Sequence, residues 1–132
     1  IRNLYVDIPF GRPDEGYDMY GPALSFFHNP IPSSITGIPG HCVENVTLEN
    51  IEVLCPGKAS KGMAYVPLSR IDKIPENIEK YPEFSMFGEL PAYGIFVRHV
   101  RGLTMKNVQY KLKAHDFRPP YVFDDVEGLK QE

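Results

Sequence analysis

Two pairs of charged residues close apolar stretches of the chain and are of types that could do chemistry there. Arg98 and His99 end the run "YGIFVRH", and Asp124 and Asp125 end the run "YVFDD". A guanidinium matches a carboxylate with two parallel hydrogen bonds, so Arg98 beside His99 suits an anionic ligand such as a uronate. For Asp124 and Asp125 a plainer interpretation stays open, in which one carboxylate caps a turn and the other is solvated.

The histidines and cysteines predict no metal site and no cofactor. His28, His41 and His115 share no ligand-like spacing with carboxylates or thiols. Cys42 and Cys55 are too far apart in the sequence for a metal motif, and two cysteines do not make a disulfide framework. We therefore expect two free thiols, packed as small apolar side chains.

Length and composition favour one globular domain built from strands and loops. The 132 residues are 42% hydrophobic and 23% charged, with 13 prolines and 11 glycines between the apolar runs. A net charge of −3 gives no footprint for nucleic acid or for an anionic membrane, and no apolar run is long enough to span a bilayer. The start at "IRNLYV" lacks an initiating Met and a signal peptide, which predicts a piece of a longer protein.

One short phrase recurs along the chain and predicts strands. It reads "VENVTLENIEV" at 43–53, "VRGLTMKNVQY" at 100–110 and "VEGLKQE" at 126–132. Apolar and polar residues alternate on either side of Asn50 and Asn107, where the alternation slips by one. Asn tolerates the left-handed backbone region, so we expect a bend there and a buried ladder between the two amides. The opening "IRNLYVDI" is a weaker copy, which we interpret as lacking the corner Asn.

The spacing of the repeat predicts how the copies are arranged. Phe96 matches Val122 and Arg98 matches Asp124, each 26 positions on. A unit of this length cannot bury its own apolar face, so copies must stack. We predict an all-β fold: a right-handed parallel β-helix of about four stacked coils, truncated at its N-terminal end. The alternative is a β-sandwich whose strands happen to be similar.

A long insertion separates the first two phrases. Within this single domain of residues 1–132, periodicity is lost over residues 56–90, and "PENIEKYP" offers at most one helical turn. Aromatic residues gather at its end, and they either cover the flank of the fold or form the wall of a ligand site. As a second loop we expect residues 28–42. The aromatic candidates for the wall are Tyr81, Phe84, Phe87 and Tyr93.

Three long stretches resemble the C-terminal part of bacterial polygalacturonase-like proteins of glycoside hydrolase family 28. They are "SSITGIPGHCVENVTLENIEV", "YPEFSMFGELPAYGIFVRHVRGLTMKNV" and "RPPYVFDDVEGL", and the resemblance extends over nearly the whole chain from Gly11. The resemblance implies a parallel β-helix, a secreted or periplasmic location, and hydrolysis of α-galacturonosyl links in pectin with inversion of configuration.

The four catalytic motifs of that family are not present as a set. The sequence contains no Asn-X-Asp and no Arg-X-Lys, and Gly40-His41-Cys42 only approximates Gly-His-Gly. The pair Asp124-Asp125 follows it, whereas the family order places the Asp pair first. We interpret both matches as chance, and we predict no catalytic residue in this chain.

The sequence therefore predicts the C-terminal portion of a pectin-degrading hydrolase, inactive by itself, whose partner is a pectic or uronide polysaccharide. The alternative is a stand-alone, non-catalytic module with a structural or carbohydrate-binding role. Uncovered strand edges also predict end-to-end self-association. The candidate substrate-binding residues are Arg98, His99, Tyr81, Phe84, Phe87, Tyr93, Asp124 and Asp125.

Overall fold

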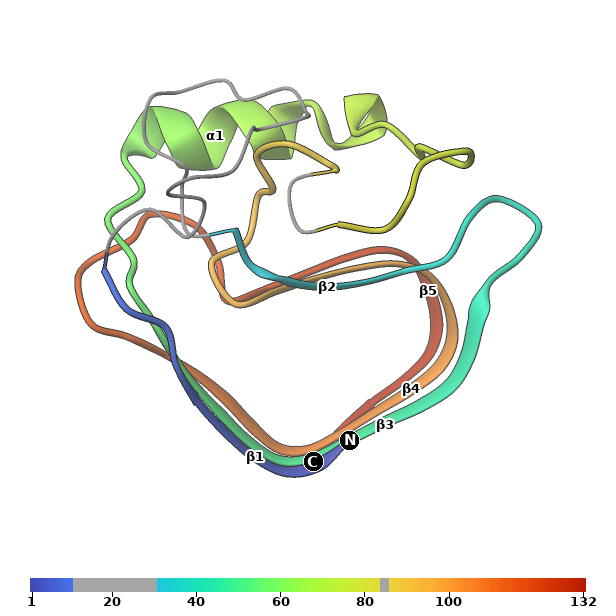
Figure 1. The fold of residues 1–132 in the computed structure, drawn as a ribbon, viewed down its shortest axis with the longest axis horizontal. Helices are drawn as coiled ribbons and strands as arrows, with labels where there is room; N and C mark the ends of the chain where they lie inside the picture. Colours follow the sequence, from blue (N-terminus) through green and yellow to red (C-terminus); the bar gives the residue numbers. More distant parts are fainter. Residues whose placement is uncertain (11–30, 84–85) are drawn as a thin grey trace.

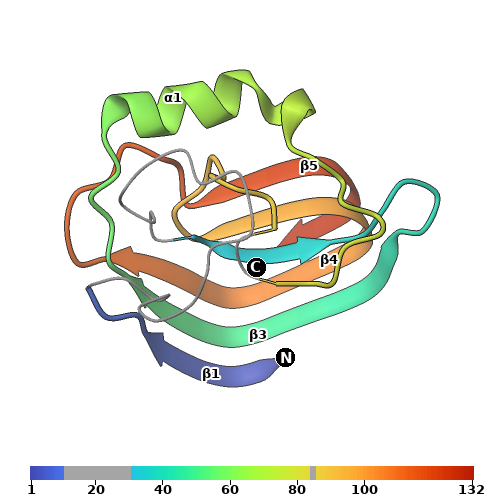
Figure 2. The ribbon, with the colours of Figure 1, turned by 45° about the horizontal axis from the view of Figure 1, so that its top comes forward.

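The strands of the chain form one curled, all-parallel sheet. The computed structural model describes residues 1–10, 31–83 and 86–132. The sheet order is β1-β3-β4-β2, with β5 also paired to β4, so β4 is the central strand (Figures 1 and 2). The strands are β1 (Arg2–Asp7), β2 (Ser33–Thr36), β3 (Val43–Cys55), β4 (Ile95–Leu112) and β5 (Tyr121–Gln131).

The predicted right-handed parallel β-helix of about four stacked coils is wrong. The described strands make a single five-stranded curled sheet, and no separate sheets are stacked around an axis in the described part of the chain. The physical reason lies in how the chain uses each repeat. One long bent strand, such as the 18-residue β4, takes the place of the three short strands that were expected in each repeat. Helical or irregular segments then lead the chain from the end of one strand to the start of the next. Parallel pairing of every strand also rules out the antiparallel sandwich.

Residues in the left-handed backbone region produce the curl, and they recur at matching positions of successive strands. Asn3, Asn50 and Asn107 have φ of 55°, 55° and 48° and share one column of the sheet. A second column consists of Asn45, Gly102 and Gly128, and a third of His99 and Asp125, all with positive φ. Glycine adopts this conformation freely, and Asn, Asp and His adopt it more often than other L-residues, so each column concentrates residue types that permit a corner.

The predicted amide ladder exists, but it lies at the surface. The Asn107 side-chain amide donates to Asn50 Oδ1 at 3.0 Å, and the Asn50 amide donates to Asn3 Oδ1 at 3.1 Å. Asn50 and Asn107 are exposed, so the expectation of buried amides was wrong. The interpretation of the first phrase as lacking a corner Asn was also wrong, since Asn3 continues the ladder.

The predicted stacking of the two long phrases is confirmed in register. Val46, Leu48, Ile51 and Val53 of β3 pair with Leu103, Met105, Val108 and Tyr110 of β4. Their side chains point into the concave side of the sheet, where they form an inner core with Ile95, Val97 and Val100. Both cysteines are free as expected, and Cys55 is part of this core.

The segment between β3 and β4 folds back over the outer face of β4 and β5. It contains helix α1 (Lys61–Ser69) and the 3-10 helix η1 (Ile71–Lys73), so the helix lies earlier than the helical turn expected at "PENIEKYP" (Figure 1). Ser60 caps α1 by accepting a hydrogen bond from the Met63 amide at 3.3 Å. A second, outer core then joins this segment to the sheet through Ile74, Phe87, Leu90, Ala92, Phe96 and Val122.

Two further features bear on the sequence predictions. The expected loop 28–42 contains β2, and its first residues, 28–30, lie outside the described ones.

β1 lies at one edge of the sheet and β5 at another (Figure 2). End-to-end association through these edges stays a prediction.

The corner column gives a first test. We expect Asn107→Ala to lower the free energy of unfolding by ~1–3 kcal/mol, because it removes the ladder bond and puts Ala at φ of 48°. Asn107→Gly loses the same bond but tolerates the backbone, so it should cost ~1 kcal/mol less. Urea denaturation measures both values. Equal losses would contradict a left-handed corner at this position.

Candidate functional site

Arg98 is buried between the sheet and the segment that covers it. Its side chain is 3% exposed and leaves β4 on the outer face, between Phe96 and the corner at His99. Nε donates to Asp124 Oδ2 at 2.8 Å, which is the stacked ion pair that the repeat predicted. Nη1 donates to the Ile74 carbonyl and Nη2 to the Ile71 carbonyl, both at 2.9 Å. Arg98 therefore attaches η1 and the residues after it to the sheet.

His99 bridges two carboxylates that come from different parts of the chain. Nδ1 lies 2.5 Å from Asp125 Oδ2 on β5, and Nε2 lies 3.0 Å from Glu76 Oε1 in the covering segment. An imidazole can donate from both nitrogens only when it is protonated. Burial works to lower the pKa of His99, but the hydrogen bonds that His99 donates to Asp125 and Glu76 outweigh it and raise the pKa above its usual value.

Asp125 is held as an anion by the same contacts. The hydrogen bond from His99, followed by the one from Arg101, lowers the pKa of the Asp125 carboxyl. Arg101 Nη2 donates to Asp125 Oδ1 at 2.9 Å, and its Nη1 donates to the Asp125 carbonyl at 3.0 Å. Arg101 also forms an ion pair with Glu127 at 3.4 Å. The result is a closed network of cations and carboxylates, which we call the charge cluster.

The charge cluster is not arranged for acid–base catalysis. Each of its acidic side chains from Glu76, Asp124 and Asp125 already contacts a cation. The acid of a glycoside hydrolase needs a raised carboxyl pKa, and the shift at Asp125 has the opposite sign. A uronate could reach the Arg98 guanidinium only by displacing Asp124 or the two backbone carbonyls. We expected the Arg98 guanidinium to bind a uronate, but it is buried and its hydrogen bonds are made within the protein.

The three described aromatic candidates, Tyr81, Phe87 and Tyr93, do not form one wall. Phe87 is buried in the outer core, and Tyr93 packs against the inner core, so these two serve different layers. Tyr81 is 87% exposed. Phe84 lies outside the described residues. The insertion was expected either to cover the flank of the fold or to form the wall of a ligand site. Phe87 covers the flank, since it packs in the outer core.

Sequence reasoning missed three members of the charge cluster: Glu76, Arg101 and Glu127. Glu76 sits in the insertion, where no periodicity relates it to His99, so only the folded chain could reveal their contact. Arg101 stands 26 positions before Glu127, and this spacing of opposite charges in register was a usable signal. Among residues 1–10, 31–83 and 86–132, no group of His, Cys, Asp and Glu is arranged to hold a metal ion. No described helix has the length and apolarity that a membrane crossing needs.

Comparison with known proteins leaves the family open. The chain matches no family model, no curated protein and no solved structure. The resemblance to polygalacturonase-like proteins therefore stays a proposal.

The burial of Arg98 gives the second test. We expect Arg98→Met to lower the free energy of unfolding by ~3–5 kcal/mol, because Asp124 and two carbonyls lose a buried cationic partner. Arg101→Met is the matched control, since the Arg101 side chain is 32% exposed and water screens its ion pairs, so it should lose much less stability than Arg98→Met. Urea denaturation of both variants measures the difference. Similar losses would show that Arg98 does not anchor the covering segment.

His99 gives a third test, based on pH. Its pKa is raised in the folded state, so its contribution to stability is complete below the unfolded pKa of about 6.5 and is lost as pH rises through the folded pKa. The free energy of unfolding should therefore fall as pH rises above about 6.5. Asn accepts the positive φ of this corner and does not titrate, so His99→Asn should show a flatter profile. Parallel profiles for the two proteins would contradict the bridge.

Proposed function

We propose that this chain is a portion of a secreted or periplasmic, pectin-degrading, polygalacturonase-like glycoside hydrolase. Its role in that enzyme is to bind pectic or uronide polysaccharide without supplying the catalytic carboxylates. The pectic part of the proposal rests on the three stretches that resemble the family. The repeated phrases pair in register, as the copies of a repeat do, but the curled sheet that they form is not the β-helix that the resemblance implies.

A single observation carries the non-catalytic part of the proposal. Every carboxylate of the charge cluster contacts Arg98, His99 or Arg101, and the pKa of Asp125 is lowered. An inverting hydrolase needs one protonated carboxyl group and one free carboxylate, separated by about 6.5–9.5 Å, with a water between the base and the sugar. Here the space between Asp125 and Glu76 is occupied by the imidazole of His99.

The fourth test measures both parts on polygalacturonate. We expect the 132-residue chain to release no reducing ends, and to be retarded in native gels that contain polygalacturonate. Fully methyl-esterified pectin, which has lost the anionic carboxylates, is the control polymer and should retard it little. The retardation should weaken as salt rises, because exposed charge contacts are screened.

Each outcome has a distinct meaning. Hydrolysis by the chain that is abolished by Asp125→Asn would show that the charge cluster is catalytic after all. Absence of any retardation by polygalacturonate would remove the polysaccharide-binding role. The gene upstream of the Ile1 codon offers a further check, since membership in the hydrolase predicts an Asn-X-Asp and an Asp-Asp pair encoded there. A start codon beside Ile1 would remove the hydrolase from the proposal.

A further inference from the structure

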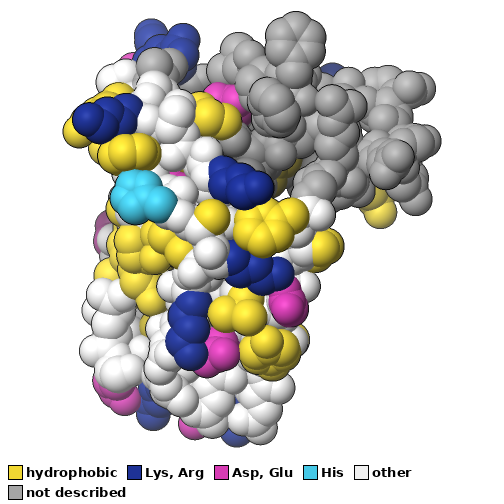
Figure 3. All heavy atoms as spheres, turned by 90° about the vertical axis from the view of Figure 1, so that its left-hand side faces the viewer, with side chains coloured by type: hydrophobic (Ala, Val, Ile, Leu, Met, Phe, Trp, Pro, Cys, Tyr) yellow, Lys and Arg dark blue, Asp and Glu magenta, His cyan; other side chains and the backbone are white. Residues whose placement is uncertain are grey.

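A second cluster of charged and aromatic residues lies at the opposite corner of the molecule, where β3 and β4 end. Two connections meet there: residues 56–61, which lead from β3 into α1, and residues 113–118, which lead from β4 to β5. Figure 3 shows this face, with Lys, His and apolar side chains side by side. We call it the lysine–aromatic corner.

Backbone hydrogen bonds join the two connections like a short ladder. The amides of Lys113 and Ala114 donate to the carbonyls of Cys55 and Pro56 at 2.9 and 3.2 Å. The Lys58 amide donates to the His115 carbonyl at 3.0 Å. Gly57 permits this approach, because a Cβ built on it would lie 2.1 Å from the Ala114 carbonyl oxygen. The corner is therefore held by its backbone and does not depend on its exposed side chains.

A buried ion pair fixes the corner from beneath. Asp116 and Arg118 have side-chain exposures of 0% and 1%, and they are joined by two contacts, of 2.9 and 3.0 Å. Asp116 Oδ2 also accepts the Ala59 amide at 3.1 Å, which ties one connection to the other. Burial acts to raise the pKa of Asp116, but the bonds from Arg118 outweigh it and keep the carboxylate charged. The Arg118 guanidinium is thus buried in the interior. The cations that face solvent at this corner are lysines.

The exposed layer alternates ammonium groups with aromatic rings. Lys58 Nζ lies 4.4 Å from the centre of the Phe10 ring, and Lys113 Nζ lies 5.5 Å from the same centre. Lys61 Nζ lies 5.6 Å from the centre of the Phe117 ring, whose edge contacts His115. Phe10 and Phe117 are 50% and 47% exposed. Each ring therefore leaves apolar surface open to solvent directly beside an ammonium group, and a ligand with both apolar faces and negative charge can contact the two together.

The charge balance of this corner differs from that of the chain. Lys113 is paired with Asp7, but within the described ranges Lys58 and Lys61 have no carboxylate partner. The chain as a whole carries a net charge of −3, whereas the described residues of this corner include more cations than carboxylates. Such a patch attracts an anionic ligand locally while the rest of the surface does not.

We propose that the lysine–aromatic corner binds an acidic polysaccharide of the uronate type, with sugar rings on Phe10 and Phe117 and uronate carboxylates on Lys58 and Lys61. The apolar faces of a pyranose suit an exposed ring, and a carboxylate on each sugar suits ammonium groups set beside the rings. The choice of saccharide rests on the proposed function. A nucleic acid also combines stacking surfaces with regular negative charge, and it enters as an outcome of the test.

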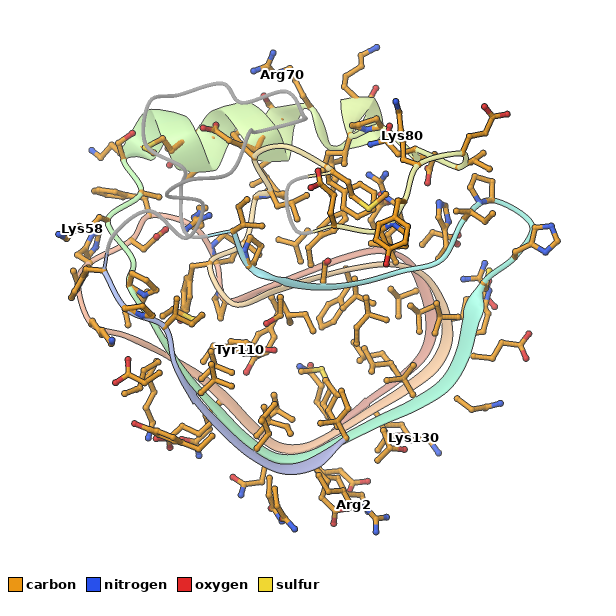
Figure 4. The ribbon with its side chains drawn as sticks, viewed as in Figure 1. Arg2, Lys58, Arg70, Lys80, Tyr110 and Lys130 are labelled. Atoms are coloured by element: carbon orange, nitrogen blue, oxygen red, sulfur yellow. The ribbon has the colours of Figure 1, made fainter. Side chains whose placement is uncertain are left out.

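The test compares two double variants with equal charge. Lys58→Gln with Lys61→Gln removes the two corner cations that have no carboxylate partner among the described residues. Lys80→Gln with Lys130→Gln changes net charge by the same amount at exposed sites that lie far from Lys58 (Figure 4). Affinity for polygalacturonate is measured by gel retardation and by calorimetry at fixed salt. Thermal unfolding of both variants shows whether they fold, and Phe117→Ala tests the aromatic contribution separately.

We expect the corner variant to lose about tenfold in affinity, the effect of two exposed charge contacts, and the control to change less than about twofold. Phe117→Ala should weaken binding without changing its salt dependence. Equal losses in both double variants would overturn the inference, since binding would then follow net charge alone. Unchanged binding in the corner variant would also overturn it, while leaving the polysaccharide-binding role intact.

Two further outcomes separate the ligand from the site. If single-stranded DNA binds more tightly than polygalacturonate and the corner variant abolishes that binding, the site is real but the ligand class is wrong, and the proposal fails as stated. If the wild-type chain binds neither polymer, the proposed function and the corner both fail. The native protein is used throughout, with no part of the chain removed.

Discussion

A left-handed corner has to recur at the same position of neighbouring strands wherever they pair through a bend, because parallel strands paired in register bend together or not at all. In this chain the corner column of Asn3, Asn50 and Asn107 satisfies that constraint with one residue type. Each Asn tolerates the positive φ, and its amide can bond to the next layer. The same register places Leu48 on Met105 inside the curl and Glu49 on Lys106 outside it. Core packing and alternating surface charge both follow from keeping the corners aligned.

Buried charge attaches the irregular segments to this sheet. The Arg98 guanidinium binds the carbonyls of Ile71 and Ile74, and the Asp116–Arg118 pair binds the connection after β3. A buried ion is costly unless hydrogen bonds surround it, so each network favours one arrangement of its segment over the alternatives. Apolar contacts such as Phe87 in the outer core add stability but are less directional. The sheet is thus set by its repeat, and the covering segments are set by two polar anchors.

The two charged regions differ in what they leave available. In the charge cluster, cations and carboxylates neutralise one another, and the Arg98 guanidinium is buried beneath the segment that it holds. At the lysine–aromatic corner the neutralised pair is underneath, and half-exposed rings lie above it, beside ammonium groups that have no carboxylate partner in the described part of the chain. This contrast is the reason for placing saccharide binding at the second region, although the first contains residues of more obviously chemical type.

The sequence by itself determined the strand register, since the spacing of 26 between Arg98 and Asp124, and the matched phrases around Asn50 and Asn107, can be aligned without coordinates. It also indicated free cysteines and the Arg98–Asp124 pair. It did not determine the architecture, because the same alternation suits separate short strands or one bent strand. Only the tertiary structure decided that Glu76 meets His99, that Arg98 is enclosed, and that Lys58 and Lys61 share a corner with Phe117. The physical reason is that these contacts join segments without periodicity to the sheet, and their positions depend on how the backbone of the insertion returns across it.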